Sequence, residues 1–203
     1  MSLRFVLASR NAHKITELRT LLAKYIKEDF ELLSLDDIGF EGDIVEDGKS
    51  FEENAIIKAS VPAGLGYIGI ADDSGLEVDA LGCEPGIYSA RYAGEPCDNF
   101  RNNMKLLDNL RDVPDSERSA RFVCVMAAVF PDGRKVIARG ECPGRILRCF
   151  AGSNGFGYDP LFYYEPLGKS FAELDASQKN EVSHRSRAIK LFSKKLNSVL
   201  EEE

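Results

Sequence analysis

The sequence contains no apolar run long enough to cross a membrane. A bilayer-spanning helix needs about 20 consecutive apolar residues, and no stretch of these 203 residues approaches that length. The first residues also lack the basic segment and the long apolar segment of a secretory signal peptide. We therefore expect a cytoplasmic protein without a membrane partner, folded as a single domain over residues 1–203 with a substantial core.

The cysteine patterns of zinc sites and disulfide frameworks are missing as well. The five cysteines are Cys83, Cys97, Cys124, Cys142 and Cys149, and no two of them form a Cys-x-x-Cys pair. An odd number of widely spaced cysteines argues against both kinds of site. We interpret them as reduced thiols, mostly in or near the core.

Positive charge and histidine are scarce. The formal net charge is -7, whereas a nucleic-acid scaffold would be expected to carry a basic face. A small anionic ligand needs only a few well-placed cations and a metal, so a nucleotide still fits as a substrate. With two histidines and neither a Ser-His-Asp order nor a Cys-His signature, covalent catalysis is disfavoured.

The most informative stretch that is present is Ala-Asp-Asp-Ser-Gly-Leu at 71–76. It ends an apolar run, and Gly75 breaks that run, so we expect Asp72 and Asp73 at a junction between a strand and a loop. Ligands of open α/β sheets collect at strand ends, and Mg²⁺ takes one or two carboxylates together with water and phosphate. An ordinary turn is the alternative, because Asp, Ser and Gly all favour turns.

The remaining pattern predicts a mixed α/β fold with a substantial antiparallel part, arranged as two lobes around a cleft. Apolar runs predict strands at 5–8, 66–71, 121–130, 135–138 and 146–147, and a turn at 131–133 makes a hairpin of the third and fourth. Helical spacing predicts helices at 15–22, 51–59, 99–110 and 185–200.

Three groups of polar or aromatic residues interrupt these elements. The first, Ser9-x-Asn11-x-x-Lys14, places a hydroxyl, an amide and an ammonium just before a helix. The first turn of a helix offers unpaired N–H groups to an anion, so this loop suits a phosphate. The alternative is that Ser9 or Asn11 caps the helix and that Lys14 is solvated.

The other two groups lie near the end of the chain. In a glycine-rich segment, Phe156 could stack on a nucleobase and Asp159 could accept from a base N–H; a tight turn with Phe156 packed inward is the alternative. His184 and Arg185 are adjacent donors that suit a carbonyl oxygen or a phosphate. Alternatively, Ser183 caps the last helix and both lie on its surface.

These motifs occur in the order and spacing of one family. The sequence also carries Phe-x-Glu-Asn-Ala-x-x-Lys-Ala at 51–59, Pro-Gly-Ile-Tyr-Ser-Ala-Arg-Tyr at 85–92 and Ser-His-Arg at 183–185. Together with the others, they resemble the inosine triphosphate pyrophosphatases over nearly the whole chain. Arg10 departs from the pattern, because glycine is usual there, and it alters the expected shape of the phosphate loop.

The resemblance implies a homodimeric enzyme with a central nucleotide-binding cleft. It implies Mg²⁺-dependent hydrolysis of ITP, dITP and XTP to the monophosphate and pyrophosphate, which clears deaminated purines from the nucleotide pool. Glu46 and Asp73 would hold Mg²⁺, and Asp72 or Asp73 would activate the water, a role that we assign to Asp73. The residues implied to contact the substrate are Ser9, Arg10, Asn11, Lys14, Lys58, Ser74, Phe156, Gly157, Tyr158, Asp159, Lys179, His184 and Arg185.

Phosphate and base fall to different members of this set. The phosphate charge would be neutralised by three lysines, Lys14, Lys58 and Lys179. Phe156 would stack on the purine while Asp159, His184 and Arg185 read its polar edge. A 6-keto oxygen accepts hydrogen bonds that the 6-amino group of adenine cannot, so unpaired donors would reject ATP.

Two other functions stay open. A pyrophosphatase for modified pyrimidines would keep the carboxylates but not a purine-selective edge. A non-catalytic regulator would bind the same nucleotides without turnover, although the complete acidic set of Glu46, Asp72 and Asp73 speaks against lost activity.

Overall fold

The structure is a computed structural model that describes residues 3–10 and 12–201, except for the side chains of residues 12–14 and 17. The chain divides into two compact units. The first consists of Met1–Asp73, Cys124–Gly140 and Ser186–Glu203, and the second of Ser74–Val123 and Glu141–Arg185. Each unit therefore combines segments that are far apart in the sequence.

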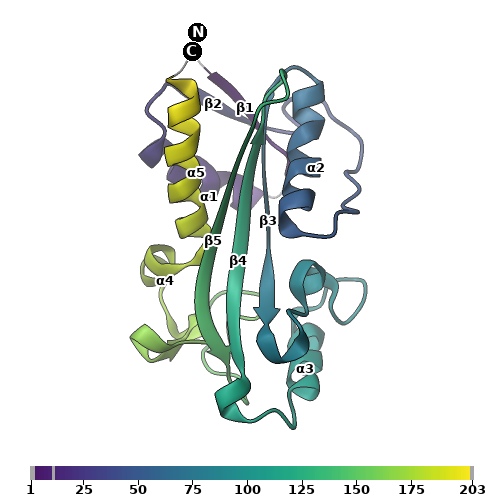
Figure 1. The fold of residues 1–203 in the computed structure, drawn as a ribbon, viewed down its shortest axis with the longest axis vertical. Helices are drawn as coiled ribbons and strands as arrows, with labels where there is room; N and C mark the ends of the chain where they lie inside the picture. The colour runs from purple at the N-terminus through teal and green to yellow at the C-terminus, as the bar shows by residue number, and fades with distance from the viewer. Residues whose placement is uncertain (1–2, 11, 202–203) are drawn as a thin grey trace. The chain divides into compact units, whose positions relative to one another are not determined.

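The described strands form one seven-stranded sheet in the order β2-β1-β3-β4-β5-β6-β7 (Figure 1). Their bounds are β1 Leu3–Leu7, β2 Phe30–Ser34, β3 Ile68–Val78, β4 Ser119–Val129, β5 Lys135–Ile146, β6 Phe162–Tyr164 and β7 Lys169–Ser170. β1 pairs in parallel with β2 and β3, whereas β6 pairs antiparallel with β5 and β7. The predicted mixed α/β fold is confirmed.

Five α-helices accompany the sheet in the described part of the chain. They are α1 Ala12–Tyr25, α2 Phe51–Gly64, α3 Asn99–Asn109, α4 Ala176–Val182 and α5 His184–Leu200. The sequence predicted all of these except α4. None of the seven residues of α4 is buried, so this helix has no apolar stripe from which its period could be recognised.

The acidic pair lies inside a strand. β3 continues for 11 residues through Asp72, Asp73 and Gly75, so the predicted strand-to-loop junction is wrong, and so is the alternative of a turn. Gly75 does not end the strand because apolar burial resumes beyond it, with Leu76 and Val78 fully buried. Similarly, the strand predicted at 146–147 is not a separate element, because β5 runs on to Ile146.

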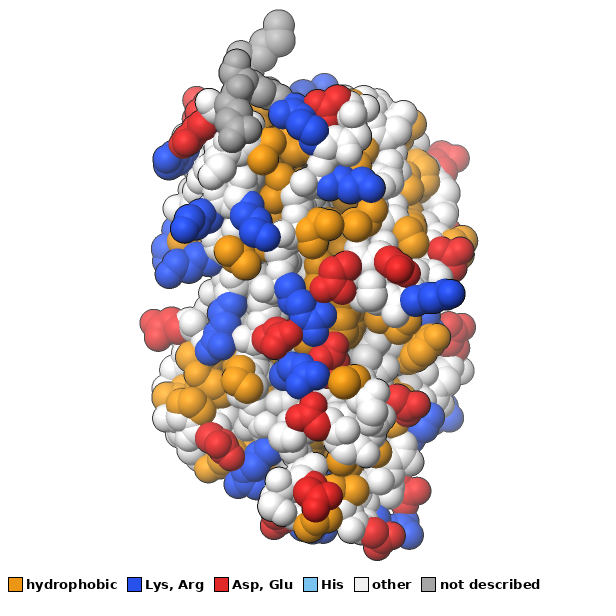
Figure 2. Space-filling view, in the orientation of Figure 1, with side chains coloured by type: hydrophobic (Ala, Val, Ile, Leu, Met, Phe, Trp, Pro, Cys, Tyr) orange, Lys and Arg blue, Asp and Glu red, His pale blue; other side chains and the backbone are white. Residues whose placement is uncertain are grey.

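The surface carries charges of both signs. On the face seen in Figure 2, basic and acidic side chains are interspersed. Three cysteines, Cys83, Cys97 and Cys149, are exposed, while Cys124 and Cys142 are buried. The expectation that most cysteines are in or near the core is therefore wrong, because the exposed three lie in connecting segments, which run over the surface. No described helix is both long enough and apolar enough to cross a membrane.

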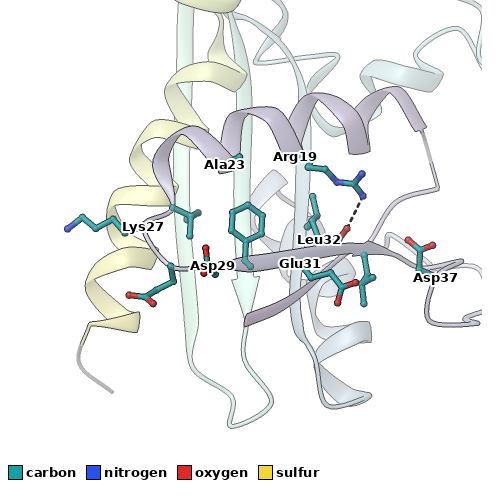
Figure 3. A pocket seen from close by; sticks show the side chains of 11 residues that line it. Arg19, Ala23, Lys27, Asp29, Glu31, Leu32 and Asp37 are labelled. Atoms are coloured by element: carbon teal, nitrogen blue, oxygen red, sulfur yellow. Dashed lines mark hydrogen bonds between the residues drawn. The ribbon is translucent and has the colours of Figure 1, made fainter. Parts of the chain in front are cut away.

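Strand β2 lies at one edge of the sheet, and beside it is an open hollow of about 650 Å³ lined by α1 and β2 (Figure 3). Inside it, Arg19 Nη2 donates to the carbonyl oxygen of Leu32 at 3.0 Å. The sequence did not predict β2, because Phe-Glu-Leu-Leu-Ser does not alternate between apolar and polar residues.

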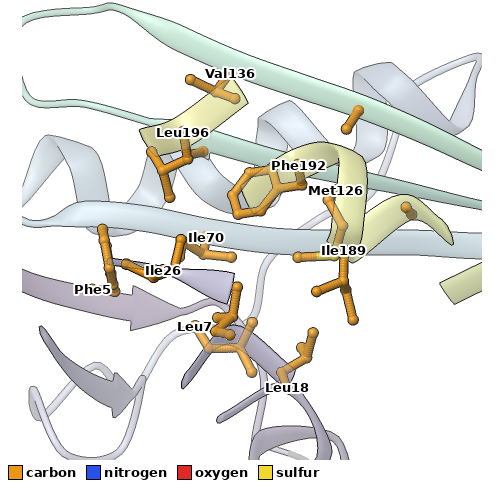
Figure 4. Close-up of a cluster of buried hydrophobic side chains, with 14 of the residues drawn as sticks. Phe5, Leu7, Leu18, Ile26, Ile70, Met126, Val136, Ile189, Phe192 and Leu196 are labelled. Atoms are coloured by element: carbon orange, nitrogen blue, oxygen red, sulfur yellow. The ribbon is translucent and has the colours of Figure 1, made fainter. Parts of the chain in front are cut away.

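The core of the first unit holds β1 in place (Figure 4). Phe5 and Leu7 of β1 pack with Leu18 of α1 and Phe192 of α5, and all four side chains are fully buried. Burial of each such side chain stabilises the fold by about 1.5–3 kcal/mol. Leu191, the neighbour of Phe192 on α5, is 39% exposed and lies outside this core.

Helix α2 approaches β3 closely in the same unit. A Cβ at Gly69 would lie 1.9 Å from the carbonyl oxygen of Ala59, so only glycine allows this approach. Ala59 follows Lys58 on the helix, and Gly69 lies four positions before Asp73 on the strand. The close approach therefore brings the side chains of Lys58 and Asp73 within reach of each other.

Candidate active site

In the first unit, one ammonium group holds two carboxylates. Lys58 Nζ lies 2.7 Å from Glu46 Oε2 and 3.0 Å from Asp73 Oδ1. Asn54, one turn earlier on α2, donates from Nδ2 to Asp73 Oδ2 at 3.3 Å. Residues four apart lie on one face of a helix, so α2 presents both donors to the carboxylates. We call Glu46, Asn54, Lys58 and Asp73 the carboxylate cluster.

The N-terminus of α2 also holds the end of the segment that carries Glu46. Ser50 caps the helix by accepting from Glu53 N. In a capping box, the Glu53 side chain would accept from the backbone N–H of Ser50. Here it accepts from Lys49 N at 2.6 Å instead. Asn54 Oδ1 accepts from Gly48 N at 2.9 Å, so the first turn of α2 is tied to residues 48–50.

Burial and charge shift the pKa values in this cluster. Burial raises the pKa of the Asp73 carboxyl, and this effect outweighs the neighbouring Lys58 charge, which lowers it. Burial by itself would lower the pKa of Lys58, but the charge of Asp73 and the bond to Glu46 outweigh burial, so the net pKa is raised. Lys58 therefore stays charged, and Asp73 is a stronger base than an exposed aspartate.

The donor set suits a small divalent cation that is shared with a phosphate. Glu46 and Asp73 each turn one oxygen to the same cationic group, and Mg²⁺ needs only one or two carboxylates when phosphate and water complete its shell. Among the described residues, no three His, Cys, Asp or Glu side chains gather into a larger metal-binding group. The residues thus fit Mg²⁺ better than a metal held by protein ligands alone.

The predicted phosphate loop begins directly after β1. Ala8 N donates to the carbonyl oxygen of Ile70 at 2.8 Å, which holds the start of this loop beside the β3 residues that precede Asp72. The side chain of Arg10 turns to residues 36–43, with Nε 3.0 Å from Asp36 Oδ1. Asn11 and the side chain of Lys14 lie outside the described part of the chain, so their predicted roles stay predictions.

In the second unit, the glycine-rich loop presents an aromatic ring. Phe156 is 62% exposed, so the alternative in which it packs inward is wrong. Asp159 is buried, and its Oδ2 accepts from Phe156 N at 2.8 Å and from Lys179 Nζ. A Cβ at Gly155, where φ is +78°, would lie 2.1 Å from the same oxygen. The glycine therefore allows the carboxylate to fold back under the loop.

Lys179, on α4, contacts this loop. Its Nζ lies 4.7 Å from the centroid of the Phe156 ring, within the range of a cation–π contact, and it forms a salt bridge with Asp159. The sequence had grouped Lys179 with Lys58 among the phosphate-binding lysines. In the structure, Lys58 is in the first unit and Lys179 is in the second.

His184 and Arg185 begin α5 and are each 8% exposed. The His184 ring stacks on Phe122, with 4.9 Å between the ring centroids and 20° between the planes. The alternative that places both residues on the helix surface is therefore wrong. Ser183, which precedes them, is buried as well.

Sequence reasoning gave no role to two buried asparagines. Asn54 was part of a recognised motif, but its contact with Asp73 depends on tertiary packing. Asn103 on α3 donates from Nδ2 to the carbonyl oxygens of Asn99 and Gly157, both at 2.7 Å, and so supports the loop that carries Phe156. The only local signal for either residue was an amide on the buried face of a helix.

Known proteins match nearly the whole chain. The sequence model of the Ham1 family matches residues 5–195. The chain is 45% identical to a dITP/XTP pyrophosphatase from Clostridium perfringens, over 97% of this chain and 98% of that protein. It is 48% identical to a dITP/XTP pyrophosphatase from Geobacter sulfurreducens, over 93% and 94%. A solved HAM1 protein from Coxiella burnetii is similar in fold, with a TM-score of 0.88, 39% identity and coverage of 99% and 100%.

Proposed function

Because this chain belongs to the Ham1 family, we propose that it hydrolyses dITP, XTP and ITP between the α- and β-phosphates with the help of Mg²⁺. The products are the nucleoside monophosphate and pyrophosphate, and the activity removes deaminated purines from the nucleotide pool. The carboxylate cluster is the observation that supports this best, since Glu46 and Asp73 each direct one oxygen to the same ammonium group, Lys58 Nζ. The relatives named dITP/XTP pyrophosphatases support the choice of substrate.

Asp73 acts as the base in this proposal. When bound, Mg²⁺ would neutralise phosphate charge and help to orient the triphosphate. Asp73 takes a proton from the attacking water while the water oxygen forms a bond to the α-phosphorus. The bond from that phosphorus to the bridging oxygen breaks, and pyrophosphate leaves with the electron pair. The pKa of Asp73, raised by burial, favours this proton transfer.

The second unit recognises the base. Phe156 offers an exposed ring for stacking on the purine, and His184 and Arg185 donate to its 6-keto oxygen. We now assign Lys179 to the base as well, because its ammonium contacts Asp159 and the Phe156 ring. ATP is rejected because its 6-amino group would leave buried donors unpaired.

Two further parts of the proposal concern location and assembly, and the second of them follows from the family resemblance. The enzyme acts in the cytoplasm, where it meets the nucleotide pool, and it acts as a homodimer. Light scattering on the purified protein tests the second part: a mass near 45 kDa, twice the 22.5 kDa of one chain, supports it, and a mass of one chain contradicts it.

A product-resolved hydrolysis assay tests the proposed function. ITP, XTP, dITP, ATP, GTP and dTTP are compared at equal concentration with Mg²⁺. We expect monophosphate and pyrophosphate to appear far faster from ITP, XTP and dITP than from the other three. Release of orthophosphate and IDP would place the cleavage at a different bond and overturn the mechanism. Binding of ITP without turnover would instead favour a regulator.

A further inference from the structure

We call residues 41–50 the acidic loop. Arg10 contacts the segment 36–43, which leads into this loop and forms its first residues. Its Nε donates to Asp36 Oδ1 at 3.0 Å, and its Nη2 donates to the carbonyl oxygens of Phe40 at 2.8 Å and Gly42 at 3.0 Å. Its Nη1 lies 3.6 Å from Asp43 Oδ1. The planar, forked guanidinium suits several acceptors at once, so one side chain from the loop after β1 contacts four residues of the segment 36–43.

The acidic loop has few other attachments. Among the described residues, the backbone of 41–49 forms no hydrogen bond with another backbone group, and Val45 is 73% exposed. The far end of the loop is held by α2, where Gly48 N and Lys49 N donate to side chains of the first helical turn. The near end is held by Arg10. The loop is thus attached to the rest of the unit at its two ends and, between them, through the contact of Glu46 with Lys58.

Glu46 lies between these two attachments. Its side chain is 37% exposed and is joined to the rest of the carboxylate cluster by Lys58 Nζ. Local opening of a loop is easiest where backbone hydrogen bonds and buried contacts are few. The position of the Glu46 carboxylate therefore depends on how firmly both ends of the acidic loop are held.

We propose that Arg10 is a positioning residue that fixes the near end of the acidic loop and so places Glu46 beside Asp73. Its guanidinium serves the loop and does not contact the phosphates of the substrate, in contrast to the sequence-based prediction. The donors that a phosphate would need already meet Asp36 and two carbonyl oxygens. The inference rests on the proposed function to the extent that Glu46 holds Mg²⁺.

Limited proteolysis tests the attachment without relying on activity. A protease specific for glutamate would be used to measure cleavage after Glu41 and Glu46, with the fragments identified by mass spectrometry. Arg10→Gly and Arg10→Lys should both be cut faster, by about tenfold, because each lacks the hydrogen bonds of the fork. Arg134→Gly is the matched control, since Arg134 pairs with Asp132 in an exposed hairpin turn and its loss removes the same charge.

In the control, cleavage after Glu41 and Glu46 should match that of the wild type. Equal cleavage rates in the wild type and both Arg10 variants would overturn the proposal. This result does not depend on any catalytic activity, so it decides the role of Arg10 even if the wild-type protein hydrolyses no nucleotide. A wild-type protein that hydrolyses no nucleotide would contradict the proposed function alone.

Metal dependence tests whether the attachment acts through Glu46. Arg10→Gly and Arg10→Lys should raise the Mg²⁺ concentration that gives half-maximal hydrolysis by about tenfold, the lower end of the range for residues that orient metal ligands. The KM for nucleotide at saturating Mg²⁺ should not change. A lysine keeps a charge that can serve a phosphate, so full rescue by Arg10→Lys would overturn the proposal.

A double-mutant cycle separates an indirect role from a direct one. Once Glu46 has been replaced in Glu46→Gln, adding Arg10→Gly should cause little further loss of hydrolysis, because both changes act on the same carboxylate. Losses that multiply would mean that Arg10 acts independently of Glu46, as a phosphate ligand would, and would overturn the proposal.

Discussion

Asp72 and Asp73 are neighbours in the chain, but their surroundings differ. Successive side chains of a strand point to opposite faces, and it is Asp73 that contacts Lys58 and Asn54. Asp72 is 3% exposed and does not take part in these two contacts. At the scale of single residues, position within β3 therefore distinguishes two carboxylates that look equivalent in the sequence, and it supports Asp73 as the base.

Asp73→Asn removes the carboxylate to which we assign the role of base. The amide cannot accept a proton from water, whereas its shape and its contact with Asn54 are similar, so we expect kcat for ITP to fall by about 100-fold or more while nucleotide binding is retained. Single-turnover hydrolysis and calorimetric titration would measure the two quantities separately. Asp132→Asn, in an exposed turn, is the control and should keep full activity. Unchanged turnover in Asp73→Asn would remove Asp73 from the role of base.

At the scale of elements, β2 illustrates how an exposed sheet edge is protected. Unpaired backbone groups of an edge strand can pair with another chain. In β2, the carbonyl oxygen of Leu32 accepts from Arg19 (Figure 3). Ser34 N donates to Asp37 Oδ2 at 2.8 Å. Two side chains from flanking segments thus occupy outward backbone groups of this strand.

The pH dependence of stability tests the contact of Asp37. The backbone N–H of Ser34 lowers the pKa of Asp37, and the Ser34 hydroxyl adds to this effect. A lowered folded pKa gives a contribution that is complete above the unfolded value of about 3.9 and is lost as the pH falls through the folded pKa. Asp37→Asn should therefore be less stable than the wild type near pH 6, and the difference should shrink below about pH 4.

Urea unfolding at several pH values between about 3 and 7 would measure this difference. The asparagine keeps an acceptor oxygen for Ser34 but carries no charge, so the comparison isolates the ionised form. A difference in unfolding free energy that stays constant over the whole pH range would contradict the assignment of the lowered pKa to Asp37.

Elements with a strong local signal were predictable, whereas contacts between elements were not. The hairpin of β4 and β5 and the helix α3 carry clear turns or periods. Glu46 and Asp73 were each recognised in the sequence, but their meeting at Lys58 depends on the glycine at position 69, which lets α2 approach β3. The bond from Asn103 to Gly157 joins residues 54 positions apart, and no local pattern indicates such a pairing.

At the scale of the whole molecule, the two units have separate cores but share strands. Ile70 belongs to the core of the first unit and Leu76 to that of the second, and both lie on β3. β4 repeats this arrangement with Met126 and Phe122. If one core melted alone, half of each shared strand would lose its packing while the other half stayed ordered. We therefore expect the two units to unfold together.

A matched pair of core substitutions tests this coupling. Leu22 on α1 and Leu106 on α3 are both fully buried, in the first and the second core respectively. Leu22→Ala and Leu106→Ala should each lower the free energy of unfolding by about 2–5 kcal/mol. Each variant should unfold in one cooperative transition, so that the unfolding curves measured by circular dichroism and by tyrosine fluorescence coincide.

Native-state hydrogen exchange supplies the sharper comparison, because it reports on each core separately. If the shared strands couple the units, Leu22→Ala should speed exchange at the slowest amides of α3 as much as at those of α1. Leu106→Ala should likewise speed exchange at the slowest amides of α1 as much as at those of α3. Faster exchange confined to the unit that carries the substitution, or a second unfolding transition, would mean that β3 and β4 do not transmit the loss. Each unit would then set its own stability in spite of the strands that they share.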